Sequence, residues 1–251
     1  MATEEPRYYD VRHLVGTSTH IDIENGTIEA AGQSFGDTAF VRALGATGWG
    51  GMVAIDNFSD AGGESGLKQA VADALALSRA TGERVELADV KTGILPVPAI
   101  KEDPRDISLE EKTELLAAIE SAARLSGIVN TRARYIESEG GTVRFMDSSS
   151  NEYQYESLRS GYSILAVAGK NGEMQQARES EHAITGLNLR HKEEKGREAA
   201  ERALLLLDAA PARGGGTMHA ILDQELAGVF AHEAIGHASE GGILSRKGGS
   251  R

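Results

Sequence analysis

Two asparagine–glycine dipeptides, Asn25-Gly26 and Asn171-Gly172, constrain the fold of this 251-residue chain more than any other local feature. An asparagine followed by a glycine favours the tight turn between neighbouring antiparallel strands, because both residues tolerate positive φ angles. Residues 22–58 carry short apolar segments separated by glycines, and residues 162–168 form an apolar run before the second turn. We therefore expect short antiparallel strands joined by hairpins at both dipeptides.

Three helices are predicted between these strand groups. Residues 66–80 place their apolar side chains on one helical face, with Gly82 as the expected end of that helix, and residues 192–208 form another amphipathic segment. Ser108 and Glu111 have the spacing of a capping box, and they predict a helix that ends at Gly127. Helices that alternate with groups of strands indicate the α+β class, with mixed α and β structure.

The remaining segments predict further strands and a fourth helix. Residues 129–156 alternate through two strands around a turn at Gly140-Gly141. Residues 217–223 have the pattern of a short strand, and residues 224–237 that of a helix.

Loops divide the chain into three predicted parts. A proline-containing stretch, residues 96–104, has the composition of a linker, and a glycine-rich loop begins at Pro211. The expected parts are a first α/β subdomain over residues 1–104, a second over 105–212, and a third region over 213–251.

Composition excludes several classes of partner and chemistry. The net charge is −12, which repels phosphate backbones, so a direct nucleic-acid partner is not expected. The sequence has no cysteine, and it therefore offers neither a thiol nucleophile nor a thiolate ligand. It has no apolar run long enough for a membrane span and no secretory signal, so we expect a cytoplasmic protein without membrane contact.

The stretch from His232 to His237 carries the pattern H-E-x-x-x-H, one residue longer than the zinc-protease motif H-E-x-x-H. On a straight α-helix, residues five apart point about 140° away from each other, so the two imidazoles would diverge. They converge if the helix changes locally to i→i+5 bonding, or if it unwinds at Gly236. The motif therefore predicts a distorted turn before His237.

If the imidazoles converge on a metal ion, the neighbouring residues have natural roles. Glu233 is placed to act as a general base, and Glu240 as a further ligand or as a partner that orients an imidazole. The alternative is a pair of structural histidines, since this short pattern occurs by chance in roughly two chains per hundred with this histidine content.

The longer string HEAIGHASEG, residues 232–241, resembles the H-E-A-x-G-H-x-x-E-G signature of the TldD/PmbA family of metallopeptidases. Residues 40–51 and 128–142 resemble two other segments of that family, and the likeness extends from about residue 20 to about residue 245. The resemblance implies the mixed α/β N-terminal region of this family, followed by the start of a truncated C-terminal catalytic domain over residues 213–251.

The same resemblance implies a site and an activity. His232 and His237 would be ligands of Zn²⁺, and Glu233 the catalytic base. The implied reaction is hydrolysis of peptide bonds in unfolded peptides or small proteins, by a homo- or hetero-oligomer that includes a related TldD/TldE-type subunit.

The family's third ligand is a cysteine far downstream, which this sequence lacks. His219, Asp223 and Glu240 are possible replacements, or a second polypeptide supplies the ligand. The alternative function is a non-catalytic subunit that binds peptides or a partner and keeps only a remnant of the metal motif. A half-length family member is also expected to expose apolar surface.

Other candidate sites have simpler interpretations. The glycine-rich residues 43–51 lack the lysine of a phosphate loop, and Trp49 within them is expected in the interior. Residues 148–150, three serines, are expected to form a polar turn rather than a nucleophile cluster.

Two pairs of basic residues remain. His182 and His191 are expected to be exposed to solvent. Arg132 and Arg134 alternate on one strand face and can clamp a carboxylate, although a solvated face is the simpler interpretation.

Overall fold

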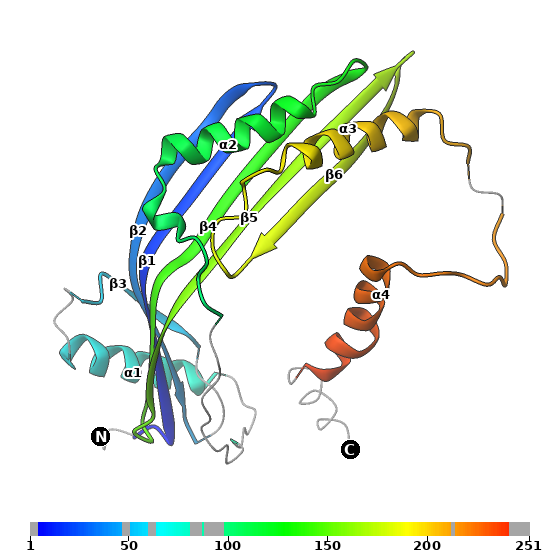
Figure 1. Cartoon of the computed structure of the whole chain (residues 1–251). Helices are drawn as coiled ribbons and strands as arrows, with labels where there is room; N and C mark the ends of the chain where they lie inside the picture. Colours follow the sequence, from blue (N-terminus) through cyan, green and yellow to red (C-terminus); the bar gives the residue numbers. More distant parts are fainter. Residues whose placement is uncertain are drawn as a thin grey trace. The chain divides into compact units, whose positions relative to one another are not determined.

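The computed structural model forms two compact units, residues 1–209 and residues 210–251, drawn in Figure 1. The structure describes residues 5–46, 51–59, 64–80, 87, 98–211 and 214–240. The predicted helix end at Gly82 and the predicted burial of Trp49 fall outside these ranges. The three-part division of the chain stays a prediction.

The larger unit contains one antiparallel sheet of six strands in the order β3-β2-β1-β4-β5-β6. Both asparagine–glycine hairpins are confirmed, joining β1 to β2 and β5 to β6, with positive φ angles at all four turn residues. Most strands are much longer than the short strands expected. They are β1 (Tyr8–Glu24), β2 (Thr27–Leu44), β3 (Val53–Asp56), β4 (Ile128–Asp147), β5 (Glu152–Lys170) and β6 (Glu173–Ala183).

The turn predicted at Gly140-Gly141 was wrong, because both glycines lie inside β4. The register between β4 and its neighbours shifts at this point, which marks a β-bulge. A Cβ atom at Gly141 would collide with the carbonyl oxygen of Val15 on β1. The glycines therefore allow two backbones to approach closely, and the chain reverses direction only after Asp147.

The predicted helices are confirmed as α1 (Glu64–Ser78), α2 (Leu109–Ala122) and α3 (Glu193–Leu207). The Ser108 hydroxyl accepts a hydrogen bond of 3.1 Å from the backbone N–H of Glu111, as a helix cap does. Helix α2 ends before the predicted Gly127, which has a φ of +92° in the turn that follows. The described part of the predicted linker is held in place, since Lys101 donates to Thr185 and Leu187 donates to Glu102.

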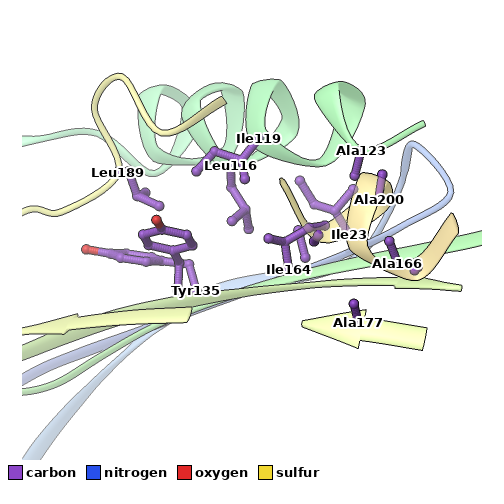
Figure 2. Packing of buried hydrophobic residues seen from close by; sticks show 14 of the residues in the cluster. Ile23, Leu116, Ile119, Ala123, Tyr135, Ile164, Ala166, Ala177, Leu189 and Ala200 are labelled. Atoms are coloured by element: carbon purple, nitrogen blue, oxygen red, sulfur yellow. The ribbon is translucent and has the colours of Figure 1, made fainter. Parts of the chain in front are cut away.

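Helices α2 and α3 pack on the same face of the sheet (Figures 1 and 2). Tyr135 and Ile164 point from the strands toward α2 (Figure 2), and Tyr162 belongs to the same buried cluster as Leu116 and Ile119 of α2. A smaller cluster of Val11, Ala39, Val41 and Ala70 packs β1 and β2 against α1. Among the described residues of the larger unit, no helix packs on the opposite face of β4, β5 and β6.

Two charged side chains of α2 are buried against the sheet. Lys112 is 0% exposed, and its Nζ atom lies 2.8 Å from Glu137, which also accepts a hydrogen bond from the Tyr135 hydroxyl. Glu120 accepts hydrogen bonds from the backbone N–H of Gly26 and from the Thr131 hydroxyl, and so connects α2 to the first hairpin. Burial of such groups is tolerated because each one is paired.

The described part of the smaller unit is irregular up to residue 223 and helical from there to residue 239. Helix α4 (Gln224–Ala231) is followed by a π-helical turn (His232–Gly236) and a 3-10 turn (His237–Ser239). The strand predicted over residues 217–223 was wrong: the segment is irregular, and the described residues of this unit contain no strand with which it can pair. None of the helices in the described residues is both long and apolar enough to cross a membrane.

Candidate metal centre

The helix distortion predicted from the histidine spacing is confirmed. The backbone N–H of His237 donates to the carbonyl oxygen of His232, five residues earlier, in the π-helical turn. Gly236 keeps helical angles, with φ −57° and ψ −60°, so the helix does not unwind at the glycine. Of the two possible distortions, the structure uses the change to i→i+5 bonding.

This turn brings the two imidazole rings together. Their centroids are 4.5 Å apart, and the ring planes meet at 73°. One ligand atom from each of His232, Glu233 and His237 lies within 4.8 Å of the other two. The imidazole nitrogens of His232 and His237 are donors of the kind that zinc takes in tetrahedral sites.

Glu240 contacts the His237 ring at Nδ1, not at Nε2. Its carboxylate lies 2.7 Å from Nδ1 of His237, whereas Glu233 lies 3.8 Å from Nε2 of the same ring. When a carboxylate accepts a hydrogen bond from the Nδ1–H group of an imidazole, Nε2 is the nitrogen that keeps a lone pair for a metal ion. The geometry therefore favours Glu240 as a positioning partner over Glu240 as a ligand.

The other proposed replacements for the missing ligand lie elsewhere. The carboxylate of Asp223 accepts a hydrogen bond of 2.9 Å from the N–H of Leu226, and so caps α4. The cluster of candidate ligands within the described ranges contains neither Asp223 nor His219. A third protein ligand, as zinc sites usually have, is not assigned.

The centre and its helix are open to solvent within their own unit. The side chain of His237 is 46% exposed, and that of Glu233 is 65% exposed. Leu226, Val229, Phe230 and Ile235 are also exposed. These apolar side chains are therefore not covered within the smaller unit.

Most of the minor expectations outside this centre are confirmed. Ser148 and Ser150 belong to the turn between β4 and β5, where Ser148 accepts a hydrogen bond from the N–H of Tyr9. His182 and His191 are exposed. The glycine-rich segment 43–51 is described only in part, so its packing role stays a prediction.

The carboxylate clamp considered for Arg132 and Arg134 is confirmed, and both side chains also remain partly exposed to solvent. Arg132 makes two hydrogen bonds to Asp22, one of them 2.9 Å long, and Arg134 makes a third. The sequence pattern pointed to a carboxylate partner, but it did not show that Asp22 on β1 supplies one.

Two family models match the larger unit. One is described as PmbA/TldA metallopeptidase domain 1 and matches residues 9–78. The other is described as the PmbA/TldA metallopeptidase central domain and matches residues 102–207.

Two archaeal relatives match almost the whole chain. A metalloprotease of Archaeoglobus fulgidus is 33% identical over 235 residues, which cover 93% of this chain and 52% of the relative. A metalloprotease of Methanocaldococcus jannaschii is 32% identical over 245 residues, with coverages of 94% and 52%. The chain thus spans about half the length of the curated relatives it matches.

Solved structures share the fold at low sequence identity. A Bacteroides thetaiotaomicron protein described as a modulator of DNA gyrase has a TM-score of 0.64 and 14% identity, covering 80% of this chain and 46% of its own. TldE from Thermococcus kodakarensis has a TM-score of 0.53 and 14% identity, covering 80% of this chain and 44% of its own. With two family models matched and the fold shared, this chain belongs to the PmbA/TldD family of metallopeptidases.

Proposed function

We propose that this chain carries the first part of a zinc-dependent peptidase centre, with His232 and His237 as metal ligands and Glu233 as the general base. The observation that carries the proposal is the π-helical turn, because it makes the two imidazoles converge with the Glu233 carboxylate close by, 3.8 Å from Nε2 of His237. Two nitrogen donors with adjacent carboxylates are a donor set that zinc accepts.

Bound zinc would polarise the carbonyl of the scissile peptide bond and acidify a water molecule. Glu233 would take the proton from the attacking water and pass it to the leaving amine. Glu240 would hold the His237 ring so that Nε2 faces the ion. The exposed carboxylate of Glu233 lies on the Nε2 side of His237, where such a proton transfer is required.

The substrate and the assembly belong to the same proposal. Unfolded peptides or small proteins are the proposed substrates, and a related TldD/TldE-type subunit is the proposed partner. The names of the curated relatives support the first point, and the structural likeness to TldE supports the second. The third metal ligand would come from a polypeptide segment that this sequence does not contain.

The test is the zinc content of the purified chain after dialysis, measured by mass spectrometry. We expect zinc that is lost in His232→Ala and in His237→Ala, and retained in the control His20→Ala, whose side chain is exposed on β1. Absence of zinc from the wild-type chain, even with zinc in excess, would instead support the non-catalytic binding subunit.

A further inference from the structure

The face of the sheet away from α2 and α3 carries a cluster of cationic side chains. Ala133 and Tyr135 of β4 are buried in the core beneath the helices. Successive residues of a strand point to opposite faces, so Arg132 and Arg134 project from the other face. The same alternation on β6 turns Ala177 to the core and Arg178 to the open face.

Strand register aligns these residues in cross-strand rows. The three rows, each running from β1 through β4 and β5 to β6, are Glu24–Arg132–Leu165–Arg178, Asp22–Arg134–Ser163–Ser180 and His20–Ile136–Gly161–His182. Arginines on β4 and on β6 therefore flank the intervening β5, which contributes the small residues Ser163 and Gly161 together with Leu165. This arrangement builds a trough with basic walls.

The trough consists of two adjoining depressions of about 440 and 550 Å³. Arg134, Ser163 and Arg178 line both of them. Gly161 extends the floor, and a Cβ atom there would collide with the His182 ring, so the glycine leaves room for the imidazole to lie over the strand. The absence of a side chain at Gly161 thus keeps this part of the floor low.

The positive charge in the trough is only partly neutralised. Asp22 accepts two hydrogen bonds from Arg132 but a single bond of 3.2 Å, through Nε, from Arg134. Arg178 is exposed and makes no hydrogen bond or ion pair with any described residue. Both arginines line the trough. The terminal N–H groups of Arg134 and the whole guanidinium of Arg178 are therefore available to a ligand there.

We propose that this trough binds an acidic stretch of extended polypeptide, with Arg178 and Arg134 donating paired hydrogen bonds to its carboxylates. Guanidinium groups match carboxylates in charge and in fork geometry. Ile136 and Ile184, each 55% exposed, line the larger depression and offer apolar contact to the neighbouring side chains of a peptide. A nucleic acid would meet the same arginines, but the net charge of −12 repels a continuous phosphate backbone.

The test measures fluorescence anisotropy of a labelled eight-residue peptide that alternates glutamate and leucine, with EDTA present so that the metal centre plays no part. A peptide with glutamine at every glutamate position is the matched ligand control. We expect the glutamate peptide to bind at least tenfold more tightly at about 0.15 M salt, as expected when charged hydrogen bonds form. Equal binding of both peptides would overturn the proposal.

Two variants test whether the glutamate peptide binds in the trough or is only attracted by positive charge elsewhere on the surface. Arg178→Gln should weaken binding of the glutamate peptide about tenfold. Arg197→Gln, the same change at an exposed position of α3, should not. Ser163→Phe keeps every charge but fills the floor, and it should weaken binding as well. Unchanged affinity in either trough variant, with circular dichroism showing a native fold, contradicts the assignment.

Two other anionic ligands test whether the trough prefers phosphate groups to carboxylates. Inorganic phosphate and a single-stranded oligonucleotide are titrated as competitors at constant ionic strength. The proposal expects both to displace the glutamate peptide poorly. Displacement by either one at concentrations below those of unlabelled glutamate peptide would make the trough a phosphate site and overturn the peptide assignment. Because no arm of this experiment needs zinc, its failure leaves the proposed metal centre untouched.

Discussion

The backbone N–H of His237 bonds to the carbonyl oxygen of His232, and this single i→i+5 hydrogen bond makes the two side chains neighbours. In regular α-helix the same residues would point about 140° apart. The extra residue in the motif and the π-helical turn therefore compensate each other. This relationship leads to the first prediction, which concerns spacing.

Deleting Ala234 should preserve zinc binding, whereas inserting one alanine after Ala234 should abolish it. Deletion leaves the histidines four apart, which regular α-helix places on one face, and insertion leaves them six apart, about 120° from each other around a regular α-helix. Isothermal titration with zinc measures both variants. If the insertion binds zinc as well as the wild-type chain does, the two imidazoles do not act together.

Replacing Glu240 with glutamine should weaken zinc binding about 10- to 100-fold, because the carboxylate orients the His237 ring. Glu225→Gln, at an exposed position in the first turn of α4, is the control. Zinc affinity is compared by competition with a chromophoric chelator. A loss as complete as that of His237→Ala would mean that Glu240 is itself a ligand.

Replacing Lys112 with methionine should lower the free energy of unfolding by about 3–5 kcal/mol, because it leaves the buried carboxylate of Glu137 without its cation. The double variant Lys112→Met/Glu137→Gln should recover part of this loss, since the uncompensated charge is then absent. Urea unfolding followed by circular dichroism measures all three proteins. A double variant less stable than the single one would show that the buried charge is not the cause.

Asp22 should contribute stability that depends on pH. Hydrogen bonds from Arg132 hold the pKa of Asp22 below its ordinary value of 3.8, with Arg134 adding to the effect. A carboxyl with a depressed folded-state pKa stabilises the fold above its unfolded pKa, and this contribution is lost as pH falls through the folded value.

The stability difference between wild type and Asp22→Asn should therefore be largest near neutral pH and shrink as pH falls below about 4. Urea unfolding at a series of pH values from 7 to 3 would measure it. Asp106→Asn, at an exposed carboxyl, should show no such trend. A difference between wild type and Asp22→Asn that stays constant across this range would argue against the ion pair.

Features encoded within a few neighbouring residues could be predicted from the sequence. Both asparagine–glycine hairpins, the three helices of the larger unit and the distorted turn before His237 all follow from local turn preference, periodicity or spacing. The family signature likewise occupies ten consecutive residues. Local backbone preference and helix geometry are sufficient for predictions of this kind.

The tertiary structure decided the features that depend on contacts between segments far apart in the sequence. The pair Gly140-Gly141 has the sequence of a turn, yet it serves the close approach of β1, which lies more than 120 residues earlier in the chain. Residues 217–223 have the pattern of a strand but lack a described partner in their own unit. Arg132, Arg134 and Arg178 form one trough only because β4, β5 and β6 are adjacent and in a particular register. Sequence by itself determined the local elements and the metal motif. Strand pairing, bulges and buried charge pairs were decided by the assembled sheet, because the free energy of a long-range contact depends on both partners being present.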